Sequence, residues 1–157
     1  KSPARRLVLC GGKVFYDLTE KRDEDGVDDV AIVRVEQFYP FPEEQLLRVV
    51  EPYLGAREIV WAQEEPQNRG GWAFMLPRLQ ALFPGHRILY SGRDASASPA
   101  VGSLHIHKLE QRELVEQTIH GEAPSRPGSV APSRPPAKAK PSASFPSVAL
   151  HRALAMQ

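Results

Sequence analysis

The sequence predicts an α/β protein of three layers (αβα), in which helices cover both faces of a mostly parallel sheet of four to five strands. Two observations lead to this prediction. Short apolar runs of four to six residues alternate with longer segments of helical character, and this strand–helix order occurs four times. Such alternation favours parallel strands joined by right-handed crossovers, which place helices on both faces of the sheet.

Four apolar runs are the candidate strands, and a turn or a charged residue bounds each of them. They are Arg5–Cys10, Val30–Val35, Glu58–Ala62 and Arg87–Tyr90. Continuous apolar character without polar alternation is typical of strands that are buried on both faces. We therefore expect these four runs to lie inside one sheet.

Four further segments are the candidate helices, and they are Lys13–Glu24, Pro42–Val50, Gly71–Phe83 and Ser103–Ile119. The second begins with a proline and two glutamates, which suit the first turn of a helix. The third has the clearest apolar stripe, made of Trp72, Met75, Leu76, Leu79, Leu82 and Phe83. Pro77 lies inside that stripe, so we expect a kink or a break there. The fourth segment has ragged apolar spacing.

The composition of the chain changes at Gly121. The segment Glu122–Ser147 contains seven of the fifteen prolines, with Ala, Ser, Arg and Lys between them. Such a segment buries too little apolar surface to offset the entropy cost of ordering it. We therefore expect one domain at residues 1–120 and a Pro/Ala/Ser-rich disordered tail at 121–157, which ends in a short helix over Val148–Gln157. The tail is interpreted as a flexible tether or as a passive end.

Charge, hydropathy and cysteine content exclude several classes of protein. The 157 residues carry a net charge of +1, with 15 basic and 18 acidic residues in 1–120, so we expect no nucleic-acid partner. No apolar run is long enough to span a bilayer, so we expect no membrane association. The single Cys10 lies in an apolar run and is interpreted as a small buried side chain. The chain opens at Lys1, and we interpret it as a piece of a longer polypeptide.

Polar and glycine-rich residues follow the candidate strands, where open α/β sheets bind ligands. Gly11-Gly12-Lys13 offers backbone N–H groups and a cation to an anion, or forms a tight turn with an exposed lysine. The loop Ser91–Ser103 combines Arg93 with several hydroxyl groups, which suits a phosphate, although an ordered connector explains it equally.

Residue spacing alone predicts no catalytic or metal site. His105 and His107 are two residues apart, which is not the spacing of a helical metal pair, and no cysteine lies beside them. Glu64 and Glu65 are adjacent, and salt bridges at an interface are the simpler interpretation of that pair. No Ser-His-Asp order with a nucleophile elbow occurs.

Four segments resemble signature segments of the 2-oxoglutarate dehydrogenase E1 family. They are Leu9–Leu18 (LCGGKVFYDL), Ile32–Gln45 (IVRVEQFYPFPEEQ), Trp61–Trp72 (WAQEEPQNRGGW) and Tyr90–Gly102 (YSGRDASASPAVG). The four segments keep the order and approximate spacing of the family between Arg5 and Ile119. Gly71, where the family often has Ala, is among the small departures, and the tail from Glu122 onward has no counterpart.

The resemblance implies the fold of the transketolase carboxy-terminal domain and a place in a larger enzyme. Such E1 subunits are homodimeric oxidoreductases of the tricarboxylic acid cycle, and they decarboxylate 2-oxoglutarate with thiamine diphosphate (thiamine pyrophosphate) and Mg²⁺. They pass the succinyl group to lipoyl-lysine on the E2 succinyltransferase of a multienzyme complex. The cofactor lies between upstream domains, so the resemblance implies no catalytic, cofactor-binding or metal-binding residue in this chain and an inactive fragment.

The resemblance also implies a structural, dimer-organising role for this domain, with the upstream E1 domains and a second E1 subunit as partners. The domain-interface motif would comprise Glu64, Glu65, Asn68 and Trp72. An acetyl-CoA or nucleotide effector would bind near Lys13, Arg93, Ser96, Ser98 and Ser103. A location in the bacterial cytoplasm is favoured over the mitochondrial matrix. The alternatives are a stand-alone regulatory or scaffold module that binds acetyl-CoA or a nucleotide, and an unrelated nucleotide-binding α/β protein.

Overall fold

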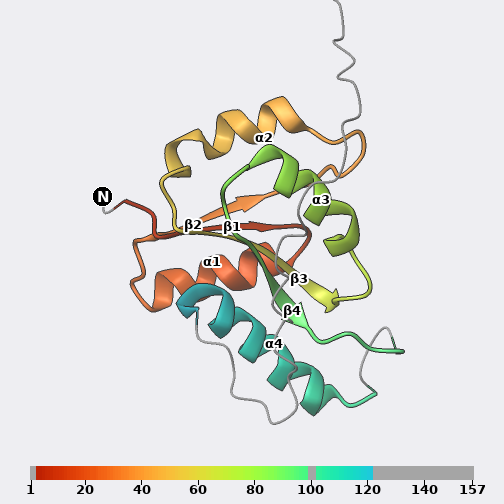
Figure 1. Cartoon of the computed structure of the whole chain (residues 1–157). Helices are drawn as coiled ribbons and strands as arrows, with labels where there is room; N and C mark the ends of the chain where they lie inside the picture. The colour runs from red at the N-terminus through yellow and green to blue at the C-terminus, as the bar shows by residue number, and fades with distance from the viewer. Residues whose placement is uncertain (1–2, 99–101, 122–157) are drawn as a thin grey trace, which may run out of the picture. The chain divides into compact units, whose positions relative to one another are not determined.

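Four parallel strands form one sheet in the computed structural model, which describes residues 3–98 and 102–121. The strands are β1 (Arg6–Cys10), β2 (Val30–Arg34), β3 (Glu58–Pro66) and β4 (Ile88–Arg93). They are arranged in the order β2-β1-β3-β4, and every neighbouring pair is parallel (Figure 1). The predicted mostly parallel sheet of four to five strands is thus confirmed, with four strands in the described residues.

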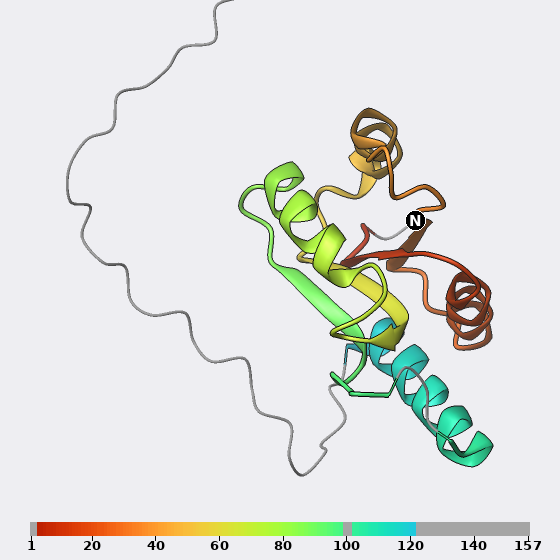
Figure 2. The same cartoon turned by 90° about the vertical axis from the view of Figure 1, so that its right-hand side faces the viewer.

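Helices cover both faces of this sheet. They are α1 (Val14–Glu24), α2 (Glu43–Val50), α3 (Trp72–Leu82) and α4 (Leu104–His120), with a 3₁₀ turn at Glu51–Tyr53. Helices α1 and α4 lie on one face, and α2 and α3 lie on the other (Figures 1 and 2). The predicted three-layer αβα architecture is therefore confirmed.

Alternating side chains of the central strands divide the core into two clusters, because successive side chains of a strand point to opposite faces. Leu7, Leu9, Ile59 and Trp61 pack toward α2 and α3. Val8, Cys10, Val60 and Ala62 pack toward α1 and α4. All eight residues are at most 2% exposed, as expected for strands buried on both faces.

Two strands continue further than their apolar runs predict. Strand β3 extends through Gln63, Glu64 and Glu65 to Pro66, and β4 extends to Arg93. The pairing of β3 with β4 shifts register between Ala62 and Pro66. The expected end of β3 at Ala62 was too early, because the residues that follow are polar. Pairing with β4 outweighs this local composition.

Helix α3 continues through Pro77 and is not broken there. The predicted stripe of this helix packs on the core: Met75, Leu79 and Phe83 are buried, while Trp72 and Leu82 are half-buried against the same cluster. The exposed ring of Pro77 lies on the solvent side of the helix, where a lost N–H is least costly.

Two arginines at the start of β1 bind the end of α4. Arg6 donates to the carbonyl oxygens of Gln117 (3.1 Å) and Thr118 (2.9 Å), and Arg5 donates to that of Ile119 (2.9 Å). Carbonyl groups at the end of a helix lack continuing intrahelical partners, and these bonds satisfy those of Thr118 and Ile119. The carbonyl of Gln117 also accepts from the N–H of Gly121. The first strand and the last helix are thereby joined.

The predicted tail at 121–157 and its terminal helix at Val148–Gln157 lie outside the described residues, apart from Gly121. Within the described ranges, no helix has the length and apolar character needed to cross a membrane.

Candidate functional site: loops at the carboxyl edge of the sheet

Gln63 is the buried centre of the loop that follows β3. Its side-chain oxygen accepts from the indole N–H of Trp61 and from the backbone N–H of Trp72, both at 2.9 Å. Its side-chain nitrogen lies within hydrogen-bond distance of the carbonyl oxygens of Glu65, Pro66 and Arg69. With 3% of its surface exposed, Gln63 fixes the loop Pro66–Gly71 from inside.

Glycines allow this loop to turn close to the core. Gly70 has a left-handed backbone (φ 64°), which favours glycine. A Cβ atom at Gly71 would lie 2.8 Å from the ring of Trp61, so an alanine there would require the ring to shift. The chain therefore enters α3 directly against Trp61.

Asn68 joins the loop after β3 to the loop after β4. Its side chain donates to the carbonyl oxygen of Ser96 and accepts from the backbone N–H of Ser96, both at 3.0 Å. Arg69 donates to the carbonyl oxygen of Ala97 (3.0 Å), and the Ser98 N–H donates to the hydroxyl of Ser96 (3.2 Å). The structure thus brings the predicted interface residue Asn68 together with the predicted effector residues Ser96 and Ser98.

Lys13 is bound to two carboxylates. Its ammonium group lies 2.9 Å from Glu64 and 3.2 Å from Asp17. The bond to Glu64 is the main cause that raises the pKa of Lys13, against a lowering contribution from desolvation. Its charge is thus already compensated.

Arg93 is also engaged within the domain, where 11% of its side chain is exposed. Its guanidinium lies 3.3 Å from Glu110 and donates to Nδ1 of His107 at 2.9 Å. An arginine has no acceptor atom, so Nδ1 accepts and the imidazole proton lies on Nε2. Ser103 caps α4 by accepting from the backbone N–H of Ile106.

Each of the five predicted effector residues has partners within the domain. Ser96 and Ser98 lie in the joined loops, Ser103 caps a helix, and the two cations each hold their own partners. Among the predicted interface residues, Glu65 is exposed. Trp72 is half-buried against Tyr90, with ring centres 5.1 Å apart.

Sequence reasoning missed Gln63 as the organiser of the loop, as well as His107 and Glu110 as partners of Arg93. The second pair had a local signal, because residues three apart on a helix lie on one face. Gln63 had no such signal, since its partners follow from the fold of a loop.

One cluster of ligand-type side chains lies at the other end of α1 and α4. It comprises Asp25, Glu116 and His120, with His120 Nε2 at 2.7 Å from Asp25. The ammonium group of Lys21 lies 3.0 Å from each of the two carboxylates, so a cation already occupies their centre. Hydrogen bonds from His120 and then Lys21 lower the pKa of Asp25. We interpret this cluster as an ion-pair network that joins the ends of the two helices.

Comparison with solved structures places the fold in a known class. A split-gene transketolase, described as an inactive β4 tetramer, aligns with a TM-score of 0.51 at 16% sequence identity, covering 75% of this chain and 38% of that one. The fold is therefore of the transketolase carboxy-terminal class. At this identity the likeness concerns the fold alone.

The 2-oxoglutarate dehydrogenase C-terminal family model matches residues 1–119. The chain is 46% identical over 118 residues to the 2-oxoglutarate dehydrogenase E1 component of Azotobacter vinelandii. It is 45% identical over 116 residues to that of Haemophilus influenzae. Each match covers 73% of this chain and 12% of the relative. The chain belongs to the 2-oxoglutarate dehydrogenase C-terminal family, and it spans about an eighth of the length of these relatives.

Proposed function

We propose that this chain is the carboxy-terminal domain of a thiamine-diphosphate-dependent 2-oxoglutarate dehydrogenase E1 component. The parent enzyme would decarboxylate 2-oxoglutarate and pass the succinyl group to lipoyl-lysine on E2. The family match over residues 1–119 carries this proposal. Relatives of about 45% identity that bear the name of this E1 component support it.

The domain itself would be a structural platform that contacts the upstream E1 domains and the second E1 subunit. Fixed loops at the carboxyl edge of the sheet support this role, because Gln63 and Asn68 hold them in one conformation. Tyr39 supports it as well: its side chain is 83% exposed beside Phe38, whose ring lies against Gly11 and Gly71 at that same edge. A large exposed aromatic next to fixed loops is typical of an interface.

The cluster of ligand-type side chains in the described residues does not fit the Mg²⁺ of the parent. Mg²⁺ prefers carboxylate and carbonyl oxygens in an open octahedral site. The candidate cluster of Asp25, Glu116 and His120 instead holds the ammonium group of Lys21. No step of the reaction is therefore assigned to residues of this chain, and thiamine diphosphate and Mg²⁺ would bind elsewhere in the parent.

The effector hypothesis for Lys13, Arg93, Ser96, Ser98 and Ser103 stays a prediction. The ion pairs of Lys13 and Arg93 weigh against it, because an effector phosphate would compete with carboxylates already in place. We also propose a domain at 1–120, a tail at 121–157 and a location in the bacterial cytoplasm, which the bacterial relatives support.

The mass of the native polypeptide tests the proposal. An immunoblot of the source cells with an antibody against this domain should show a band about six times heavier than 17.4 kDa, since the 118 matched residues make up 12% of the relative's length. A single band near 17.4 kDa would contradict it and favour a stand-alone regulatory module.

The platform role needs its own experiment in the parent enzyme. Tyr39→Ser should shift the parent toward monomers in analytical ultracentrifugation and leave the unfolding of the isolated domain unchanged. Val49→Ser is the matched control, because Val49 is 53% exposed on α2, away from that edge. Equal dimer stability in the two variants would remove Tyr39 from the interface.

A further inference from the structure

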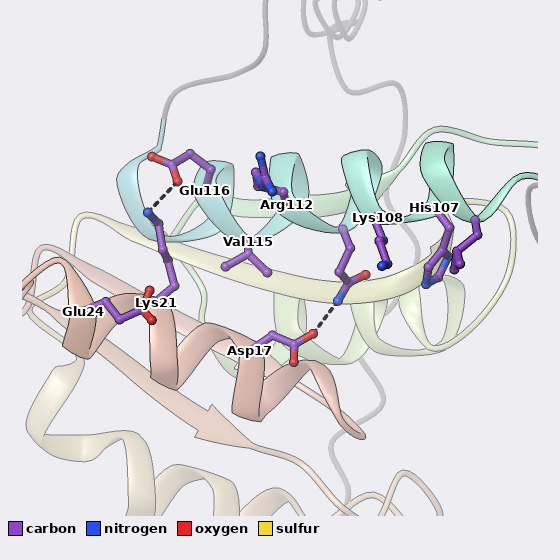
Figure 3. A pocket seen from close by; sticks show the side chains of 10 residues that line it. Asp17, Lys21, Glu24, His107, Lys108, Arg112, Val115 and Glu116 are labelled. Atoms are coloured by element: carbon purple, nitrogen blue, oxygen red, sulfur yellow. Dashed lines mark hydrogen bonds and ion pairs between the residues drawn. The ribbon is translucent and has the colours of Figure 1, made fainter.

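A groove of about 620 Å³ lies between α1 and α4, and neither the family nor the proposed function accounts for it. Its walls come from the two helices alone, and Figure 3 shows the side chains that line it. The volume lies in the range of roughly 300 to 1,000 Å³ that is typical of small-molecule sites. Residue patterns alone do not predict the groove, because it depends on how α4 packs beside α1.

The two ends of the groove differ in charge. His107 and Lys108 lie at one end, and Glu24, Lys21 and Glu116 lie at the other (Figure 3). The basic end coincides with the amino-terminal half of α4, where the backbone dipole also favours a negative charge. An anion in the groove would therefore take the end near Lys108.

The carboxylate nearest to the basic end is already compensated. Asp17 accepts from the side-chain nitrogen of Gln111 at 2.7 Å and lies 3.2 Å from the ammonium group of Lys13. In Figure 3 a dashed line runs from Asp17 on α1 to a side chain of α4. This carboxylate is thus occupied and does not neutralise the cations on α4.

Two cations of the groove, Lys108 and Arg112, have no partner in the part of the chain that the structure describes. Both are exposed, both line the groove, and neither forms an ion pair or hydrogen bond with a residue in the described part of the chain. They are four residues apart on one helix, so their like charges repel each other. A bound anion would relieve that repulsion.

Apolar side chains lie beside these cations. Leu104 lines the same end of the groove with 69% of its surface exposed, and Val115 is buried in the wall between the helices. Burying such surface favours a ligand that has an apolar part. The chemistry of the groove is therefore that of an amphiphilic anion site.

We propose that the groove between α1 and α4 binds a small organic phosphate or carboxylate. Lys108 and Arg112 would hold its anionic group, and its apolar part would pack on Leu104, one helical turn before Lys108. His107 would add a hydrogen-bond donor, since its imidazole proton lies on Nε2 while Nδ1 accepts from Arg93. The site is independent of the chemistry of the parent enzyme.

Phenyl phosphate is a suitable probe, titrated into the ¹⁵N-labelled 157-residue chain and followed by amide chemical shifts. We expect saturable shifts confined to residues 104–115 and 17–24, and binding at least about fivefold tighter than that of inorganic phosphate because the ring buries apolar surface. If the groove accepts a carboxylate as well as a phosphate as the anionic group, benzoate should bind at the same residues. Added salt should weaken both.

The double variant Lys108→Gln/Arg112→Gln should weaken phenyl phosphate binding at least about tenfold, the effect of losing a charge-assisted hydrogen bond. Its control is Arg48→Gln/Arg57→Gln, which removes the same charge from two exposed arginines outside the groove. The control should bind as the unchanged chain does. Equal weakening in the two double variants, shifts spread over the surface, or absence of saturable binding would each overturn the proposal.

Discussion

Gln63 shows how one buried polar side chain determines the shape of a functional loop. Its amide oxygen accepts from two N–H groups, and its amide nitrogen faces three carbonyl oxygens. The carbonyls of Glu65 and Pro66 also accept from Tyr90 and Arg69, so removal of the amide would mainly affect the N–H groups of Trp61 and Trp72 and the carbonyl of Arg69. A buried polar group without a partner costs about 1 to 3 kcal/mol. The loop Pro66–Gly71 therefore depends on Gln63 more than on any backbone preference of its own residues.

The substitution Gln63→Leu should lower the free energy of unfolding by about 2 to 4 kcal/mol, because it keeps the volume and removes the hydrogen bonds. Urea unfolding followed by tryptophan fluorescence measures this. Gln67→Leu, at an exposed position of the same loop, should change stability by less than about 0.5 kcal/mol. Similar values for the two variants would refute the central role of Gln63.

Cys10 illustrates the opposite case, a titratable group whose surroundings keep it unreactive. Burial raises the pKa of this thiol to about 12. Thiolate is the reactive form, so at pH 8 the folded chain should react with Ellman's reagent far more slowly than the chain in 6 M guanidinium chloride, in which one thiol reacts promptly. Rapid reaction of the folded chain would mean that β1 is more accessible than the structure shows.

At the scale of elements, local patterns predicted the type and order of every α-helix and β-strand in the described residues, but not the 3₁₀ turn at Glu51–Tyr53. Apolar runs and a 3.6-residue stripe are sufficient for this, because both report burial directly. The ends of the strands were harder to predict than the strands themselves. The residues after Ala62 are polar (Gln63, Glu64 and Glu65), yet β3 continues through them. Gln63 can belong to the strand because its side chain is buried and forms its hydrogen bonds in the core. Helix α4 had ragged spacing because its first half borders a groove.

The candidate site was less predictable than the fold, because its contacts join separate elements. The sequence did indicate which loops form it, since the carboxyl ends of parallel strands meet at one edge of the sheet. It did not reveal that Lys13 binds Glu64 or that Arg93 binds Glu110, because each pair joins elements that are distant in sequence. Charge compensation between elements can be known only once the elements are placed.

Helix α3 contains a proline that destabilises it, and the packing of the helix on the core outweighs this destabilisation. Pro77 lies in its interior, where the ring removes the bond to the carbonyl of Ala73. Pro77→Ala should raise the free energy of unfolding by about 1 to 2 kcal/mol, which is the difference in helix propensity less the entropy regained by the unfolded chain. Pro84→Ala, an exposed proline beyond the helix, should not stabilise. A destabilised Pro77→Ala variant, measured by urea unfolding, would show that the proline shapes the helix for packing.

The clamp between β1 and α4 links local structure to the stability of the whole domain. Arg6 is 6% exposed and binds Glu58 as well as two carbonyl groups at the end of α4. Arg6→Met keeps the apolar stem but removes the donor to the Glu58 carboxylate and to the Thr118 carbonyl, so it should lower the free energy of unfolding by about 2 to 4 kcal/mol. Arg57→Met, at an exposed position next to Glu58, should cost less than about 0.5 kcal/mol. Equal costs for the two variants in urea unfolding would show that the clamp does not hold the domain together.

At the scale of the whole molecule, the described contacts close within residues 5–121. Both core clusters have their members between Leu7 and Ile119. Gly121 ends α4 with a left-handed backbone (φ 82°) beside the guanidinium of Arg6. The first strand and the last helix thus contact each other directly, so the two ends of residues 5–121 belong to one folded unit, as in an independently folding domain.

A chain that ends at Gly121 should therefore unfold within about 0.5 kcal/mol of the 157-residue chain, because no described core contact is removed. A chain that ends at Glu116 should lose several kcal/mol, since it lacks buried Thr118 and Ile119 and the carbonyls that Arg5 and Arg6 bind. Urea unfolding of the three chains at one pH and salt concentration provides the comparison. If the chain ending at Gly121 is as unstable as the shorter one, residues beyond 121 contribute to the fold, and the proposed division at 120 is wrong.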